Sequence, residues 1–252
     1  MIDGLFSQDR IFDDRTVIKQ GLRGYRFSVD ALLLAWFVFR HMGKQKSFFS
    51  LELGAGSGVV SLLLKRHGLI GKIDCVERDA GLCSLLKENV EQNALSEQIF
   101  PLCGDLRFLR FSPEQYDIVF FNPPYHPPVA GRTSPDKEKA TARHELFGSL
   151  DDFLQKGKFA LKKKGRLFFI HPANRAVYAY AKIASHGLAP LETMAVREHE
   201  TDDPSLFLYY CVSSDPIKTK QRFTLLTMKN NDGSDTPEGK TILYAPNRGT
   251  RT

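Results

Sequence analysis

The chain has 252 residues, of which 42% are hydrophobic and 25% are charged, and its formal net charge is +6. This length and apolar content suffice for one large hydrophobic core, and they exclude a disordered or fibrous chain. The mild basic excess suits a nucleic-acid partner, although many ordinary enzymes share it.

The cysteines and the apolar runs indicate the broad class of the protein. Because no cysteine lies in a CxxC pair and no histidine cluster is near, we expect buried, reduced thiols in a cytoplasmic protein and no metal site. The cysteines are Cys75, Cys83, Cys103 and Cys211. Asp3 and Asp9 interrupt the start, which argues against a signal peptide. The longest apolar run, 31–39, is too short to span a bilayer, so we predict a buried core helix and no membrane segment.

Predicted strands and helices alternate along most of the chain. Strands are predicted at residues 48–53, 72–77, 99–103, 116–121 and 165–170. Helices are predicted at residues 31–42, 59–67, 81–93, 150–161 and 173–186. Two closing strands, 189–197 and 206–212, have no helix between them and are predicted to be antiparallel. The pattern predicts an α/β fold with a seven-stranded, mostly parallel sheet, an antiparallel edge strand and helices on both faces.

The chain divides into three predicted parts. Residues 1–45 form an N-terminal segment with a short extended piece at 16–18, residues 46–214 form the α/β domain, and residues 215–252 form a basic tail with at most a strand or two. Within the domain, residues 126–147 are polar and rich in proline and charge. A loop of this length inside a compact domain is usually functional or disordered.

Three strand ends carry residues suited to a nucleoside. A glycine loop, LELGAGSG at 51–58, follows the first domain strand and opens a helix. Glycine there allows a tight turn and lets the backbone approach a ligand closely. Glu77 ends the next strand and can accept from ribose hydroxyls, and Asp105 follows the third strand and can accept from an adenine amino group. Because the carboxyl ends of parallel strands meet at one edge of a sheet, these residues predict a nucleoside site there.

The order of these motifs resembles that of the class I methyltransferases, over roughly residues 25–212. LELGAGSG is similar to their first motif, VERD to the second, CGDLR to the third and NPPY, at 122–125, to the fourth. The resemblance implies S-adenosylmethionine as cofactor and a Rossmann-like methyltransferase fold. The cofactor-binding residues that it implies are Ser28, Asp30, Glu52, Gly54, Ala55, Gly56, Gly58, Glu77, Arg78, Asp105, Leu106 and Asn122.

The NPPY motif predicts how a planar amine is methylated. An amino group on adenine is a poor nucleophile because its lone pair is delocalised into the ring. The side-chain oxygen of Asn122 and the carbonyl of Pro123 can each accept one N–H and favour a pyramidal nitrogen in the transition state. Pro123 and Pro124 fix the backbone, and Tyr125 is expected to stack on the base. We therefore predict Asn122, Pro123, Pro124 and Tyr125 as catalytic, without a strong general base.

Two further segments indicate the substrate. QGLRGYRFSVDALLLA at 20–35 and ARHE at 142–145 resemble segments of the tRNA1(Val) adenine-37 N6-methyltransferase family. The resemblance implies N6-methylation of an adenine in tRNA near the anticodon, with Ser28 and Asp30 helping to wall the cofactor pocket. Asp30 would equally suit a plain helix cap. From the basic loop after NPPY, Arg132, Arg143 and His144 are predicted to contact the RNA.

Other substrates remain open at this point. They are an adenine N6 or guanine N2 in ribosomal RNA and a protein glutamine, and a non-catalytic RNA-binding module would also suit the basic charge. About 45 residues precede the first domain strand, too few for the helical substrate domain of glutamine methyltransferases. The oligomeric state, monomer or homodimer, is not predicted.

Overall fold

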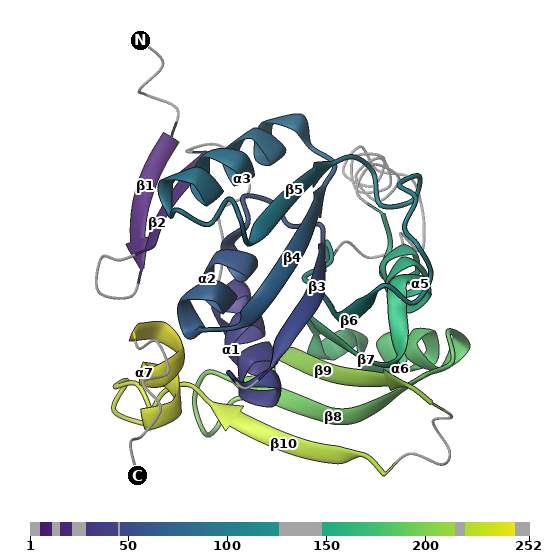
Figure 1. Ribbon diagram of the computed structural model, residues 1–252. Coiled ribbons are helices and arrows are strands. Elements are labelled where there is room, and N and C mark those ends of the chain that lie inside the picture. Colours follow the sequence, from purple (N-terminus) through teal and green to yellow (C-terminus); the bar gives the residue numbers. More distant parts are fainter. Residues whose placement is uncertain are drawn as a thin grey trace, which may run out of the picture.

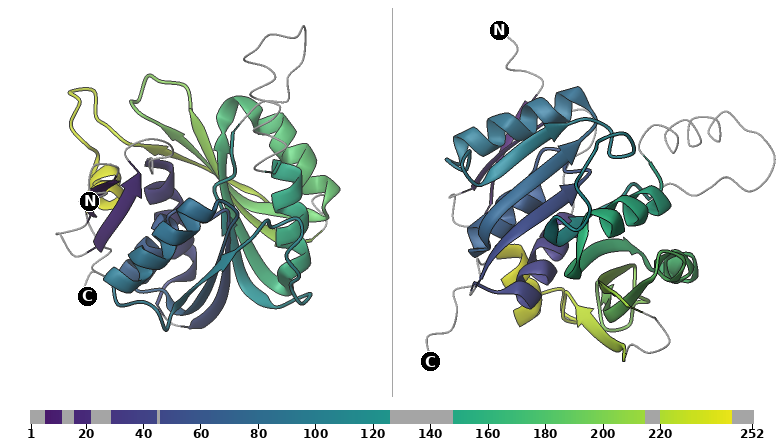
Figure 2. Two further views of the ribbon diagram at one scale, coloured as in Figure 1. Left: turned by 90° about the horizontal axis from the view of Figure 1, so that it is seen from above. Right: turned by 45° about the vertical axis from the view of Figure 1, so that its right-hand side comes forward.

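A twisted sheet forms the centre of the described part of the chain. The computed structural model describes residues 6–11, 16–21, 29–44, 46–125, 148–214 and 220–244. Helices cover both faces of the sheet, α1, α2 and α3 on one and α5 and α6 on the other (Figure 1 and Figure 2). The helices are α1 (Val29–Met42), α2 (Val59–His67), α3 (Ala80–Gln92), α5 (Leu150–Ala160), α6 (Ala176–Ser185), with the short η1 (Ala173–Arg175) before it, and α7 (Pro237–Tyr244).

The main sheet contains eight of the described strands, in the spatial order β10-β8-β9-β7-β6-β3-β4-β5. Its strands are β3 (Ser47–Leu53), β4 (Ile70–Glu77), β5 (Ile99–Cys103), β6 (Tyr116–Phe121), β7 (Leu161–Pro172), β8 (Leu188–Arg197), β9 (Leu206–Ser213) and β10 (Arg222–Thr227). All neighbours pair in parallel except β9, which is antiparallel to both β7 and β8. The predicted fold class is therefore confirmed.

The sheet differs from the prediction in two details. It has eight strands and not seven, and the antiparallel strand lies between β7 and β8 rather than at the edge. The additional strand is β10, which runs parallel to β8 and forms the edge. Among its residues only Leu226 is buried, and the apolar side chains of Phe223 and Leu225 are exposed, so β10 does not show one buried apolar face. Glu192 of β8 holds it by pairing with Arg222 and accepting from the Thr224 hydroxyl at 2.8 Å.

The described part of the predicted basic tail therefore belongs to the folded body. After β10 the chain forms α7, a helix that the sequence did not predict, and α7 packs against α1 (Figure 1). Ile242 of α7 is 1% exposed and joins the same apolar cluster as α1 and α2.

The two faces of β6 show how the strands divide the core. Ile118 and Phe120 pack with α1, α2 and α3, whereas Val119 and Phe121 pack with α5 and α6. Successive side chains of a strand point to opposite faces, so a central strand between two helical layers is apolar throughout. Helix α1 is buried along most of its length, as predicted, because it lies between the sheet, α2 and α7. No helix among the described residues is both long and apolar enough to cross a membrane.

A separate hairpin of β1 (Phe6–Ile11) and β2 (Thr16–Gly21) lies beside α3 (Figure 1). Two asparagines, one in α3 and one at its C-terminal end, bind the backbone of β2. The Asn89 side chain accepts from the Lys19 N–H at 2.8 Å and donates to the Lys19 carbonyl at 3.1 Å. Asn93 makes the same pair of bonds to Val17, at 3.1 and 2.7 Å. These side chains satisfy backbone groups that a neighbouring strand would otherwise serve.

Candidate functional site

The glycine loop connects β3 to α2, and its glycines have different surroundings. Gly54, Gly56 and Gly58 have φ angles of 68°, 57° and 86°, in the left-handed region that favours glycine. A Cβ at Gly58 would lie 2.2 Å from Leu86 Cδ1, so any side chain at this position would have to displace Leu86 of α3. A Cβ at Gly56 would meet no atom within 4 Å. Gly56 is itself buried, so the space beside its Cα is one that a side chain or a closely bound ligand would fill, and not an open surface.

Glu77, at the end of β4, is held by the backbone of the loop beside it. Its Oε2 accepts from the Gly56 N–H at 2.7 Å and its Oε1 accepts from the Asp79 N–H at 2.7 Å. Burial raises the pKa of the Glu77 carboxyl, and the N–H donors of Asp79 and Gly56 oppose that rise. A carboxylate oxygen can accept more than one hydrogen bond, so each oxygen retains capacity for a hydroxyl donor. This geometry fits the ribose hydroxyls of the predicted cofactor.

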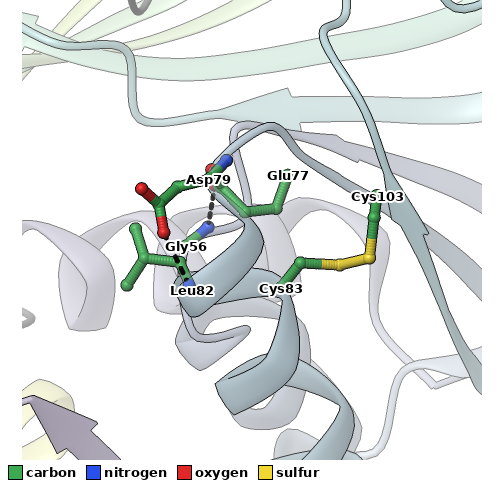
Figure 3. Close-up of a disulfide and its surroundings, with 6 residues drawn as sticks. All are labelled: Gly56, Glu77, Asp79, Leu82, Cys83 and Cys103. Carbon is green, nitrogen blue, oxygen red and sulfur yellow. Dashed lines mark hydrogen bonds between the residues drawn. A yellow bond between two sulfur atoms is a disulfide. The ribbon is translucent and has the colours of Figure 1, made fainter.

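Asp79 supports this acid, although the sequence analysis did not single it out. Its backbone N–H binds Glu77, and its side chain accepts from the Leu82 N–H at 2.8 Å, which caps the start of α3 (Figure 3). A carboxylate is a favoured residue at the N-cap, where it satisfies an unpaired backbone donor. The available signal was an aspartate shortly before the helix predicted at residues 81–93, which begins at Ala80 in the structure.

Asp105 follows β5, and its carboxylate pairs with two arginines, Arg107 and Arg78. Arg107 donates to its carboxylate at 2.6 to 3.2 Å, and Arg78 Nε lies 3.3 Å from Asp105 Oδ2. The hydrogen bond from Arg107 holds the pKa of Asp105 below its usual value, although partial burial acts in the opposite direction. An adenine amino group would therefore compete with these guanidinium groups for the carboxylate. Leu106, the next residue, is buried in the cluster that contains α5 and α6.

A disulfide links helix α3 to strand β5. Cys83 of α3 and Cys103 at the end of β5 are bonded, with their Cα atoms 5.8 Å apart (Figure 3). The prediction of four reduced thiols is therefore wrong for this pair, because the fold and not a CxxC spacing brings the two cysteines together. Cys75 and Cys211 are buried free thiols, as predicted.

Glu52 lies in β3, shortly before Gly54, and its side chain is buried in the core. Its carboxyl accepts from the Ser61 hydroxyl of α2 and lies near the Cys75 thiol at 3.8 Å. Burial raises the pKa of Glu52 to about 8, against the effect of the Ser61 hydrogen bond. These contacts hold β3 to α2. The predicted contact between Glu52 and the cofactor stays a prediction.

The NPPY residues follow β6, which lies next to β3 in the sheet. The Tyr125 hydroxyl is 2.5 Å from Asn122 Oδ1 and 3.0 Å from Asp30 Oδ2 in the first turn of α1. Pro123 is buried, whereas Asn122 and Tyr125 are half-buried. The structure thus brings the N-terminal segment into contact with the predicted catalytic tip, over 95 residues of sequence.

His171, near the end of β7, lies beside the tip and was missed by the sequence analysis. Its ring lies edge to face against the Tyr125 ring, with centroids 5.8 Å apart, and the residue is 1% exposed. Burial, together with the nearby charge of Arg175, lowers the pKa of His171 to about 4, so the imidazole is neutral at pH 7. The available signal was its place at the end of a strand next to β6.

Four predicted site residues, Ser28, Arg132, Arg143 and His144, lie outside the described residues. Within the described ranges, the structure contains no group of three or more histidine, cysteine or acidic side chains that could hold a metal ion.

Comparison with known proteins identifies the family. Residues 33–186 match the family model described as methyltransferase small domain. This chain belongs to that family. A protein of Tolumonas auensis named tRNA1(Val) (adenine(37)-N6)-methyltransferase is 28% identical over 237 residues, which cover 92% of this chain and 91% of the relative. A Trichodesmium erythraeum protein of the same name is 30% identical, over 68% of this chain and 67% of the relative. The resemblance predicted from the sequence is therefore confirmed.

Solved structures agree on the fold. A structure described as a predicted O-methyltransferase from Agrobacterium tumefaciens has a TM-score of 0.65 at 19% identity, covering 84% of this chain and 94% of that one. The geranyl diphosphate C-methyltransferase of Streptomyces coelicolor, solved with S-adenosyl-L-homocysteine, has a TM-score of 0.51 at 12% identity, covering 70% and 74%. At these identities the likeness concerns the fold alone.

Proposed function

We propose that this methyltransferase transfers a methyl group from S-adenosylmethionine to N6 of an adenine in tRNA, at position 37 of a tRNA1(Val)-type substrate. The observation that carries the proposal is the position of the NPPY tip. Asn122 follows β6, directly beside the strand that leads into the glycine loop. An acceptor for a planar amine thus adjoins a nucleoside site, and relatives named for this reaction match along most of the chain.

The proposed cofactor site uses the glycine loop and Glu77. The space that the absent side chain leaves at Gly56 and the remaining acceptor capacity of Glu77 fit a nucleoside with two ribose hydroxyls. S-adenosylmethionine, when bound, supplies an electrophilic methyl group on a sulfonium. The roles of Arg78, Asp105 and Leu106 toward the adenine ring remain part of this proposal, and Arg107 would have to release Asp105.

The proposed substrate site uses Asn122, Pro123 and Tyr125. The Asn122 side-chain oxygen and the Pro123 carbonyl accept the two N–H groups of the amine, which directs the nitrogen lone pair toward the methyl group. Most of the acceleration then comes from holding the reactants in line. The methylated nitrogen loses its proton readily, so the proposal needs no strong base, and neutral His171 does not have to act as one.

The nucleic-acid partner is proposed from the names of the relatives and from the net charge of +6. Arg132, Arg143 and His144 are the residues that we propose for RNA contact. The N-terminal segment, 1–45, is proposed to cap the site, which the contact between Asp30 and Tyr125 supports. A cytoplasmic location belongs to the same proposal, because the substrate is tRNA.

A transfer assay with separate substrate pools tests the proposal. Purified protein is incubated with methyl-labelled S-adenosylmethionine and, in separate reactions, with total tRNA, ribosomal RNA and protein from a strain that lacks the gene. The expected result is label in tRNA. Label only in ribosomal RNA or in protein would support methyltransferase activity but would show that the proposed substrate is wrong. If no pool is labelled and calorimetry detects no cofactor binding, the non-catalytic RNA-binding module remains.

A further inference from the structure

The Tyr125 hydroxyl lies between two acceptors that differ in charge. It is 2.5 Å from the carboxamide oxygen of Asn122 and 3.0 Å from a carboxylate oxygen of Asp30. A phenol carries a single proton, so a strong hydrogen bond to one acceptor weakens the bond to the other. Ionised carboxylates form stronger hydrogen bonds than neutral amides. Asp30 therefore competes with Asn122 for the tyrosine proton.

This competition matters for the reaction proposed above. Asn122 Oδ1 is the atom that should accept an N–H of the substrate amine, and in this structure the Tyr125 hydroxyl is within hydrogen-bond distance of it. When the phenolic proton turns toward Asp30, the amide oxygen is fully available to the amine. Without a carboxylate at position 30, the Tyr125 hydroxyl keeps donating to Asn122 Oδ1, and this hydrogen bond competes with the substrate amine.

The Tyr125 ring is supported from a second side. The His171 ring packs edge to face against it, with an interplanar angle of 84°. His171 is buried near the end of β7, the strand next to β6, so its position is fixed by the sheet. One aromatic contact and one carboxylate contact together fix both the plane and the hydroxyl end of Tyr125.

We infer that Asp30 is a positioning residue, which acts through the Tyr125 hydroxyl to free Asn122 for the substrate amine and to orient the tyrosine ring for stacking on the base. The inference rests on the proposed function. It also assigns Asp30 a role different from the predicted one, in which this residue walls the cofactor pocket. A positioning role predicts a loss in turnover, whereas a cofactor role predicts a loss in cofactor affinity.

Kinetics of Asp30 variants in two backgrounds test the inference. We expect D30N and D30A to lower kcat by about tenfold or more, with D30A the more severe because Asn retains a neutral acceptor. The dissociation constant of S-adenosylmethionine, measured by calorimetry, should change less than about twofold. In a Y125F background, which lacks the hydroxyl, adding D30N should change kcat less than about twofold. An equal loss in both backgrounds, or a loss confined to cofactor affinity, would overturn the inference.

A matched control is available in a second tyrosine–aspartate pair. The Tyr116 hydroxyl donates to Asp74 Oδ2 at 2.7 Å, at the start of β6 and away from the strand ends that form the site. D74N removes a carboxylate from this similar pair and should leave kcat and cofactor affinity unchanged. A loss with D74N as large as that with D30N would show that the effect is structural, and would contradict the inference.

A substrate-free measurement separates this inference from the proposed function. In protein labelled with 13C at tyrosine Cζ, the Tyr125 resonance is assigned by its absence in Y125F. D30N should shift this resonance, and D74N should not. A shift without any methylation of tRNA by the wild type would refute the proposed function and leave the contact standing. Absence of a shift would refute the role of Asp30, whatever the wild type methylates.

Discussion

Glu77 Oε2 accepts a hydrogen bond from the Gly56 N–H at 2.7 Å, which links the acid at the end of β4 to the glycine loop after β3. The other oxygen of the same carboxyl binds the Asp79 N–H at the start of α3. One side chain therefore holds the loop and the helix start in a fixed relation, and it faces the site with the acceptor capacity that remains. We therefore expect both nucleoside binding and the order of this region to depend on Glu77.

Replacing Glu77 should weaken cofactor binding more than any later step. Glu77→Ala removes the ribose acceptor and leaves the Gly56 and Asp79 donors without their partner, so we expect the dissociation constant of S-adenosylmethionine to rise by about tenfold or more. At saturating cofactor, turnover should recover in large part. Calorimetry and steady-state kinetics measure the two effects. Unchanged affinity would remove Glu77 from the ribose site.

Gly58→Ala should destabilise the fold. We expect the free energy of unfolding to fall by about 2 kcal/mol or more, because the left-handed backbone costs an L-residue about 1 kcal/mol and displacement of Leu86 costs at least about 1 kcal/mol. Gly187→Ala is the control, since Gly187 has a φ of 63° and open space around its Cα. It should lose only the backbone part, about 1 kcal/mol. Equal losses in urea unfolding of the two variants would argue against the clash with Leu86.

The parts of the fold that could be predicted from the sequence are those set by local patterns, such as apolar runs and glycines at their ends. The predicted limits of α2 and β6 coincide with the observed ones, because glycines precede α2 and the apolar run of β6 ends at Asn122. Strand β7 begins earlier than predicted, because the lysines at residues 162–164 interrupt the apolar pattern at its start. One of them, Lys162, pairs with Asp117 of β6 at 2.6 Å, a partner that no local pattern reveals.

The site residues likewise fall into those that local sequence signals predict and those that only the fold brings together. Glu77 ends one predicted strand and the NPPY tip follows another, and the residue types themselves indicate their chemistry. The contact of Asp30 with Tyr125 and the disulfide between Cys83 and Cys103 depend on the packing of segments that are distant in the sequence. The position of His171 at the end of a strand was too weak a signal by itself, because a histidine after a strand is ordinary, and only its contact with Tyr125 distinguishes it.

The buried acid Glu52 should make stability depend on pH. Its folded pKa of about 8 lies above the ordinary value of 4.5, so the folded state holds a proton that the unfolded state releases between these values. The stabilising contribution is complete below about pH 4.5 and is lost as the pH rises through about 8. From pH 5 to 8, the wild type should lose stability relative to Glu52→Gln, by at most about 1.4 kcal/mol per pH unit. Urea unfolding of both proteins at several pH values measures this difference, and a constant difference would contradict the assignment.

The disulfide should stabilise the fold under oxidising conditions. Cys83 and Cys103 are 20 residues apart, and closing a loop of about this length restricts the unfolded chain by an amount worth about 3 kcal/mol. Dithiothreitol should therefore lower the free energy of unfolding of the wild type. The double variant Cys83→Ala with Cys103→Ala should not respond to reductant, because Cys75 and Cys211 are unpaired. A wild-type unfolding curve that reductant leaves unchanged would show that the bridge contributes nothing.

Mass spectrometry of nucleosides from tRNA, after incubation with methyl-labelled S-adenosylmethionine and either the wild type or Asn122→Ala, tests the central claim most directly. The tRNA comes from a strain that lacks the gene. We expect labelled N6-methyladenosine with the wild type and none with Asn122→Ala. The affinity of this variant for S-adenosylmethionine should be nearly unchanged because Asn122 acts on the substrate amine, and this result would remove Asn122 from the predicted cofactor-binding residues. Label in another nucleoside, or a near-wild-type yield from Asn122→Ala, would contradict the proposed reaction or the proposed role of the NPPY tip.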